Sequence, residues 1–102
     1  MSKANARRGA KMERRAKKEL EAAGYYAVKS ARSMGIWDIW CIKGADVRLI
    51  QVKSTDSAAP ALSLYAADVA KMEAADVIAQ QELWVWRLRK GWEKILIRGR
   101  GL

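Results

Sequence analysis

Apolar residues in the first quarter of the chain recur at the spacing of an α-helix, three or four positions apart. This spacing predicts a helix over residues 9–23, and Gly24 is a typical residue for its end. Residues 1–8 are polar and basic, and we expect them to form a flexible N-terminal arm. The apolar positions of the predicted helix are Met12, Ala16, Leu20 and Ala23.

Beyond Gly24 the pattern changes to short apolar runs rich in β-branched and aromatic residues, which are typical of strands. The turn at residues 43–46 predicts a hairpin between the second and third runs, and residues 65–79 return to helical spacing. The order α-β-β-β-α-β-β predicts an α/β fold with a mixed central β-sheet flanked by helices. The predicted strands are 25–30, 36–42, 47–53, 83–88 and 92–97.

Length and charge indicate one small basic domain. The chain has 102 residues, which suits a single domain over residues 1–102. Twenty Lys and Arg against 11 Asp and Glu give a formal net charge of +9. This positive charge indicates a polyanionic partner, and nucleic acid is the usual one. A ribosomal or membrane-surface protein would show the same excess, so charge alone leaves these alternatives open.

The rarest residue types exclude several chemistries. The chain has no His, which excludes imidazole bases, His-ligated zinc and Ser-His or Cys-His nucleophile pairs. Cys41 is the only cysteine, so no internal disulfide can form, which fits a reducing compartment. No apolar run approaches a membrane span or a secretory signal. We therefore expect no membrane association and a cytoplasmic location (the host cytoplasm for a phage-encoded protein).

Candidate chemistry lies on the predicted hairpin. In a strand, residues two apart share a face, so Gln51 and Lys53 point one way and Ile50 and Val52 point to the core. The hairpin turn brings Asp38, on the preceding strand, close to them. An acid in an apolar strand needs a partner, which Lys53 or a divalent metal could provide. A purely structural Asp-Lys pair is the competing interpretation.

Glu13 is a second candidate acid. At 100° per residue it lies about 20° from Leu20 in projection, at the edge of the apolar stripe and off the basic face. A glutamate there needs a polar pocket to reach. The alternative is an ordinary surface glutamate that pairs with Lys17 at position i+4.

Together, Glu13, Asp38 and Gln51-Val52-Lys53 resemble the PD-(D/E)XK nuclease signature, and the surrounding segments resemble archaeal-type Holliday junction resolvases. The resemblance covers roughly residues 8–97 and implies a restriction-endonuclease-like core. Each motif is short, and the order and spacing carry the specificity. The segments are Arg8-Gly9 with Glu13-Arg14, residues 24–33, Gly35-Ile36-Trp37-Asp38-Ile39, Gln51-Val52-Lys53-Ser54-Thr55 and Gly91-Trp92.

The resemblance implies roles for these residues in a site that holds Mg²⁺ or Mn²⁺. Asp38 is the expected central ligand, joined by the Gln51 side-chain oxygen, the Val52 backbone carbonyl, and Glu13 directly or through water. Lys53 is expected to orient the attacking water or to stabilise charge on the phosphate. The expected DNA-binding residues are Arg14, Lys29, Ser30 and Arg32 near the motifs, and Arg7, Arg8 and Lys11 farther away.

The implied function is paired symmetric cleavage of four-way junctions by a homodimer, since the junction is itself two-fold symmetric. Exposed apolar residues on the second helix, such as Tyr65 and Met72, are candidates for the dimer interface, with ordinary core packing as the alternative. Two departures from the family matter: Gln51 replaces the usual Glu, and Trp37 stands where Pro is frequent. Fewer charges predict weaker metal binding.

Three rival functions remain open. The first is a nuclease with the same core that cuts flaps, damaged DNA or plain duplex. The second is a protein that binds branched DNA without cutting it, which the loss of an acid at Gln51 keeps open. The third, and weakest, is a ribosome-associated protein, which would leave the Asp38 and Lys53 hairpin unexplained.

Overall fold

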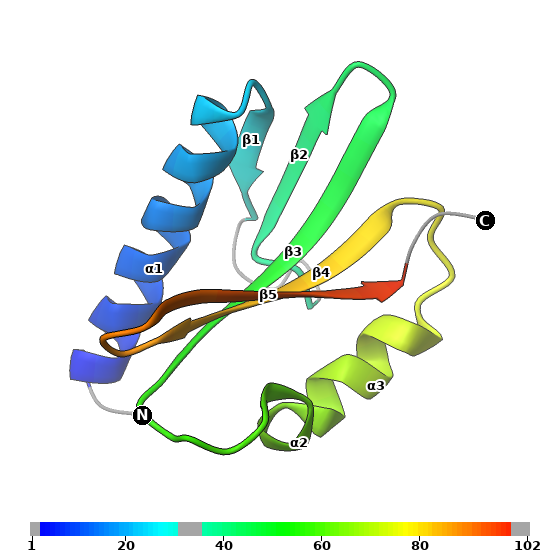
Figure 1. Ribbon diagram of the computed structural model, residues 1–102. Coiled ribbons are helices and arrows are strands. Elements are labelled where there is room, and N and C mark those ends of the chain that lie inside the picture. The colour runs from blue at the N-terminus through cyan, green and yellow to red at the C-terminus, as the bar shows by residue number, and fades with distance from the viewer. Residues whose placement is uncertain (1–2, 31–35, 99–102) are drawn as a thin grey trace.

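The computed structural model describes residues 3–30 and 36–98, with side chains described for residues 8–30 and 36–97. Within them a central sheet carries one long helix on one side and two short helices on the other (Figure 1). The elements in chain order are α1 (Lys3–Ala22), β1 (Tyr26–Lys29), β2 (Ile39–Lys43), β3 (Asp46–Thr55), α2 (Ala61–Leu64), α3 (Ala66–Ala74), β4 (Gln80–Arg87) and β5 (Gly91–Arg98).

The sheet has five strands in the order β1-β2-β3-β4-β5. Neighbouring strands run antiparallel except β3 and β4, which are parallel. A parallel pair needs a crossover connection, and α2 with α3 provides it. The predicted mixed α/β sheet and its α-β-β-β-α-β-β order are therefore confirmed, and the crossover also contains the short helix α2, which precedes the predicted second helix.

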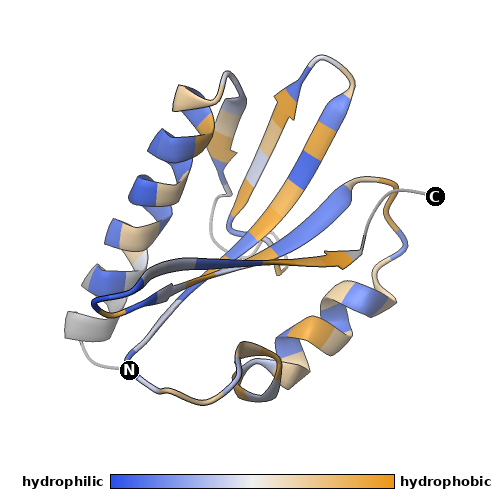
Figure 2. Cartoon of the chain, viewed as in Figure 1, coloured by the Kyte–Doolittle hydropathy of each residue, from blue (hydrophilic) through white to orange (hydrophobic). Residues whose placement is uncertain are grey.

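Each face of the sheet has its own hydrophobic cluster, because side chains alternate along the strands. Figure 2 shows this alternation as hydrophobic and hydrophilic bands along β3. On the α1 face, Met12, Ala16 and Leu20 of the helix pack with Ile50 and Val52 of β3. On the other face, Ala61, Leu83 and Val85 form the centre, with Tyr65, Val69, Ile95 and Ile97 packed against it.

Two glycines allow sharp reversals of the chain. Gly24 has φ +96° and ends α1: its N–H bonds the Glu21 carbonyl at 3.0 Å, and the Tyr25 N–H bonds the Leu20 carbonyl at 3.0 Å. This is the Schellman arrangement, which confirms the predicted helix end. Gly44, with φ +61°, lies in the two-residue turn between the paired residues Lys43 and Asp46, which confirms the predicted hairpin.

Several predicted boundaries were wrong. Helix α1 begins at Lys3, so residues 3–8, predicted as part of a flexible arm, continue the helix. The physical reason is that this segment contains good helix formers and no proline. The helix predicted over residues 65–79 begins one residue later, at Ala66, and ends at Ala74, because Ala75 adopts an extended backbone.

The predicted interface residues on the second helix are core residues. Met72 is fully buried, and Tyr65 packs against the cluster around Leu83. The ordinary-packing interpretation therefore holds for both. Within residues 3–30 and 36–98, no helix is long and apolar enough to cross a membrane.

Candidate active site

Asp38 lies directly before β2, one residue outside the strand in which it was predicted. Three hydrogen bonds fix it: its N–H donates to the Ile50 carbonyl at 2.9 Å, and its carbonyl accepts from the Ser30 N–H at 2.8 Å. Its carboxylate accepts from the Val52 N–H at 2.7 Å. That N–H belongs to the peptide joining Gln51 to Val52, so the acid lies beside the predicted Gln51-Val52-Lys53 motif.

The electrostatic surroundings of Asp38 bring other predicted residues into range. Burial raises the pKa of its carboxyl above the ordinary value, and the charges of Glu13 and Asp68 act in the same direction. The Val52 N–H and the charge of Lys53 oppose this rise. Two further acids and one lysine therefore lie close enough to Asp38 to influence its charge.

Gln51 is buried, with 6% of its surface exposed, and its side-chain oxygen accepts no hydrogen bond within residues 3–30 and 36–98. No donor reaches this Oε1 from any residue that the structure describes. Buried polar atoms are nearly always satisfied, so an orphaned oxygen needs an explanation. An oxygen that accepts from a ligand, from water or from a hard cation would provide one.

Lys53 lies on the same face as Gln51, as the strand alternation predicted, but its ion pair differs from the expected one. Its Nζ lies 3.4 Å from an Asp68 carboxylate oxygen of α3 and 5.6 Å from the centre of the Tyr65 ring. Asp68 was missed in the sequence, where it is an ordinary polar position of a helix. No local signal reveals it, because only the β3-α2-α3 connection brings it to Lys53.

Glu13 reaches the site from the α1 side. Its carboxylate lies 3.6 Å from Lys29 Nζ, whereas Lys17 pairs with Glu21 at 3.3 Å. The predicted alternative, a Glu13–Lys17 pair, is therefore not formed. Lys29 is the register partner of Ile39, the residue after Asp38, so this ion pair lies at the same end of β2.

The donor set suits a hard cation only if amide and backbone oxygens are included. Among the described residues, no group of three or more His, Cys, Asp or Glu side chains is arranged to hold a metal ion. Asp38, Glu13 and the orphaned Gln51 oxygen are all oxygen donors of the kind that Mg²⁺ and Mn²⁺ accept. The Val52 carbonyl remains a predicted ligand.

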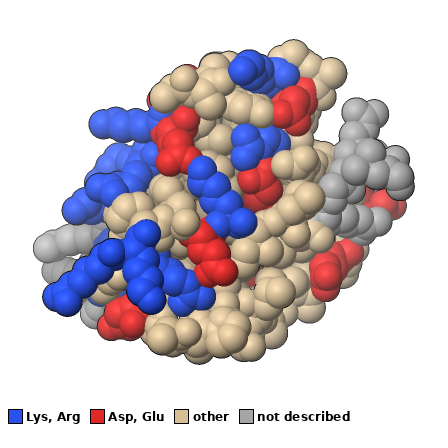
Figure 3. Space-filling model, in the orientation of Figure 1, with Lys and Arg blue, Asp and Glu red and all other residues tan. Residues whose placement is uncertain are grey.

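Basic residues gather on α1, the helix that carries Glu13. Figure 3 shows lysine and arginine side chains concentrated on the side of the molecule that α1 forms. Arg14 is exposed and lines a shallow hollow of about 330 Å³ with Lys11, Arg15 and Lys18. Arg8 is also exposed and, with Lys11, lines a neighbouring hollow.

The other predicted DNA-binding residues have different surroundings. Lys29 is ion-paired with Glu13, and the Ser30 N–H is bonded to the Asp38 carbonyl. Arg32 lies outside the described residues. Arg7 lies in α1, but its side chain is not among those described.

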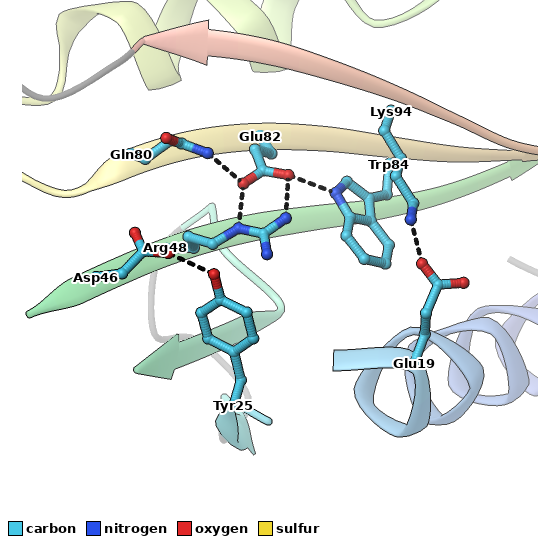
Figure 4. A network of polar contacts seen from close by, with 8 residues as sticks. All are labelled: Glu19, Tyr25, Asp46, Arg48, Gln80, Glu82, Trp84 and Lys94. Atoms are coloured by element: carbon cyan, nitrogen blue, oxygen red, sulfur yellow. Dashed lines mark hydrogen bonds and ion pairs between the residues drawn. The ribbon is translucent and has the colours of Figure 1, made fainter. Parts of the chain in front are cut away.

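A separate polar network lies on the α1 face of the sheet (Figure 4). Arg48 of β3 and Glu82 of β4 form a buried ion pair, with Arg48 Nη2 2.7 Å from Glu82 Oε1. Glu82 also accepts from Gln80 and from the Trp84 indole, both at 2.8 Å. Every oxygen of this acid therefore has partners within the protein, unlike the oxygen of Gln51.

The fold belongs to the α/β class with a restriction-endonuclease-like core. A solved structure with this fold is that of Hjc, a Holliday junction resolvase from the archaeal hyperthermophile Archaeoglobus fulgidus. The likeness has a TM-score of 0.62 and 19% sequence identity, and it covers 88% of this chain and 73% of that chain. No protein-family model and no curated protein matches the chain. At this identity the likeness shows a shared fold.

Proposed function

We propose that this chain is a metal-dependent DNA endonuclease that resolves four-way junctions by paired, symmetric hydrolysis of phosphodiester bonds as a homodimer. The observation that carries the proposal is a group of three side chains, those of Asp38, Gln51 and Lys53, at one point of the sheet. The Asp38 carboxylate is fixed by the Val52 N–H, and beside it lie the orphaned Gln51 oxygen and the charge of Lys53. The fold that presents them is shared with a Holliday junction resolvase.

The residues that would hold the cation are Asp38, Gln51, the Val52 carbonyl and Glu13. The partnerless Gln51 oxygen supports this assignment, because coordination would satisfy it. When bound, Mg²⁺ or Mn²⁺ neutralises phosphate charge and makes a bound water more acidic. With one carboxylate fewer than the resembled family usually has, binding is expected to be weak.

Lys53 is the residue proposed to act on the phosphate. Its ion pair with Asp68 and its position over the Tyr65 ring hold the ammonium group on the face that Gln51 shares. A positive charge fixed in advance stabilises the negative charge that grows on phosphate oxygens during hydrolysis. Asp68 is thus a positioning residue that acts through Lys53.

Pairing of two copies is the second part of the proposal. A two-fold symmetric junction is matched by a two-fold symmetric dimer. The exposed apolar residues Tyr26, Trp40 and Ile42 lie together on β1 and β2, where Tyr26 pairs with Ile42 and contacts the Trp40 ring edge-on at 6.2 Å. Such a cluster is costly to expose, and a second copy would cover it.

The test compares nicking and binding in matched variants. We expect wild-type protein with Mg²⁺ or Mn²⁺ to nick a fixed four-way junction faster than a flap or a linear duplex. Asp38→Ala and Lys53→Ala should each lower the rate by at least roughly 10²-fold while junction affinity stays within a few-fold. The controls Asp76→Ala and Lys71→Ala change an exposed acid and an exposed lysine elsewhere and should nick normally.

Each alternative has its own outcome in this assay. Junction binding by wild-type protein without nicking would assign the chain to the non-cleaving branched-DNA binders. Preference for flaps or linear duplex would keep the nuclease and change the substrate. Full activity in Asp38→Ala would remove the proposed site.

A further inference from the structure

A hollow of about 440 Å³ lies between the first half of α1 and the ends of β3 and β4. Its apolar lining comes from Met12, Trp86 and Leu88. Its lining residues Met12 and Ser54 are chain neighbours of Glu13 and Lys53, but strand alternation turns Ser54 to the α1 face and Lys53 to the α3 face. The volume lies within the range of small-ligand sites, about 300–1,000 Å³.

The rim of this hollow is cationic. Arg8, Lys11 and Arg15 line it, and Arg15 places its guanidinium 4.4 Å from the centre of the Trp86 ring. Lys11 and Arg15 also line the shallow hollow farther along α1, so positive charge continues from one hollow to the next. A continuous basic path of this kind suits the backbone of a nucleic acid strand.

Other tryptophans pack against the Trp86 ring of the Arg15 and Trp86 pair. The Trp92 ring meets Trp86 edge-on at 5.2 Å and 78°, and Trp84 meets Trp92 at 5.5 Å. Trp92, itself packed against Trp84, therefore supports the Trp86 ring of this pair. Aromatic rings and arginine planes are the surfaces on which unpaired bases stack.

Ser54 adds a polar group to the apolar lining. Its Oγ is buried and finds no hydrogen-bond partner among the residues described. A buried hydroxyl with nothing to bond is unusual and marks a place where a ligand can supply the partner. A site for phosphate alone would need neither this hydroxyl nor the apolar wall.

We propose that this hollow binds one unpaired nucleotide of single-stranded DNA. The base stacks on the platform of Arg15 and Trp86, the Ser54 hydroxyl bonds its edge, and Arg8 and Lys11 hold the adjoining phosphates. The inference rests on the proposed function, since an open branch point is a source of unpaired nucleotides. It deepens that function by assigning a nucleotide site separate from the cleaving residues.

The test measures whether the protein binds bases or only phosphates. Wild-type protein in EDTA, where no cleavage occurs, is titrated against a labelled thymidine tetranucleotide and against an abasic tetramer with the same phosphates. Fluorescence anisotropy gives both dissociation constants. We expect the base-bearing strand to bind about tenfold tighter, the effect of stacking one base.

Two substitutions separate stacking from charge. Arg15→Lys keeps the positive charge and removes the planar guanidinium group. Because Arg15 is exposed, the fold should be unaffected. Trp86→Leu removes the ring, with circular dichroism as the check on folding. Each should reduce the preference for the base-bearing strand to about twofold or less. Lys71→Arg, which exchanges an exposed cation on α3, should leave the tenfold preference intact.

Equal affinity of wild-type protein for the two tetramers would overturn the proposal. A tenfold preference for the base-bearing tetramer in Arg15→Lys would also overturn it. If Trp86→Leu does not fold, Arg15→Lys is the variant that decides. Loss of the preference in Lys71→Arg would place the base elsewhere. Because no step requires cleavage, failure here is distinct from failure of junction nicking, which concerns Asp38 and Lys53.

Discussion

Gln51 occupies the most unusual environment of any predicted site residue. Its side chain is buried in the sheet, its oxygen is unsatisfied by the described residues, and the carboxylate of Asp38 contacts the peptide that follows it. A glutamate in its place would carry a negative charge beside Asp38 and Glu13. Whether residue 51 is neutral or charged therefore decides how much a bound cation stabilises the site.

Gln51→Glu should make stability depend on divalent metal. In EDTA we expect the variant to be roughly 1–3 kcal/mol less stable than wild type, because it buries a charge without a partner. Saturating Mn²⁺ should recover that loss and raise the melting temperature more than it does for wild type. Thermal denaturation with and without Mn²⁺ measures both effects.

Gln81→Glu is the matched control for this prediction. Gln81 is also buried in the sheet, but its amide is fully used: Oε1 accepts from the Trp37 indole at 3.0 Å and Nε2 donates to the Met72 carbonyl at 2.8 Å. The control should lose stability equally with and without metal. An equal metal response in the two variants would argue against Gln51 as a ligand.

At the residue scale, the sequence predicted those parts of the site that depend on local geometry. Alternation along a strand placed Gln51 and Lys53 on one face, and the hairpin placed Asp38 beside them. It could not identify Asp68 as the partner of Lys53, because that pairing depends on how α3 packs after the crossover. Ion pairs between distant segments have no local signature.

Among the elements, β3 is the strand on which the fold and the site both depend. It pairs with β2 on one side and with β4 on the other, and it carries Arg48 at one end and Lys53 at the other. The Arg48–Glu82 pair fastens it to β4. Although burial raises the pKa of Glu82, hydrogen bonds from Arg48, Trp84 and Gln80 outweigh it and hold the pKa below its ordinary value.

Glu82→Gln should therefore destabilise the protein at neutral pH by roughly 3 kcal/mol, the cost of breaking a buried ion pair and leaving Arg48 uncompensated. A lowered carboxyl pKa gives stability that is present above the unfolded value, about 4.3, and is lost as pH falls through the folded value. The difference between wild type and variant should shrink below about pH 4. Urea denaturation at pH 7 and pH 3 measures it.

Glu93→Gln is the control for this effect. Glu93 is exposed and pairs with Arg87 at 2.8 Å, so its loss should cost less than about 1 kcal/mol at either pH. A Glu82→Gln variant as stable as this control would show that the buried pair does not hold β3 to β4.

Element types were easier to predict from the sequence than element ends. The helix stop at Gly24 and the turn at Gly44 were predicted because glycine is the residue that most readily adopts a positive φ. The early end of the second helix was not, since residues 65–79 keep helical spacing, whereas α3 ends at Ala74 and Ala75 is extended. The parallel pairing of β3 and β4 is likewise a tertiary choice that no local pattern encodes.

On the scale of the whole molecule, charge is distributed unevenly. The formal net charge is +9, and the basic side chains of α1 gather on one side (Figure 3). A concentration of this kind on one helix indicates the surface that faces a polyanion. Of the active-site candidates, Glu13 lies on the same helix as these basic residues.

Salt dependence of DNA binding tests this assignment. We expect the logarithm of junction affinity in EDTA to fall linearly with the logarithm of NaCl concentration. Arg14→Gln and Lys18→Gln should each reduce the slope by about one, because each removes one phosphate contact. Lys71→Gln, on α3, should leave the slope unchanged. If the slopes of Arg14→Gln and Lys18→Gln equal that of Lys71→Gln and of wild type, α1 is not the DNA-facing surface.

A strand-resolved nick map of a fixed four-way junction tests the central claim most directly. Each strand is end-labelled in turn, incubated with wild-type protein and Mg²⁺ or Mn²⁺, and sized. A cleaving site built from Asp38, Gln51, Lys53 and Glu13 in a symmetric dimer predicts one pair of nicks at matched positions on two opposing strands, and none in EDTA. A junction that is bound by the protein yet stays intact on all four strands would contradict it.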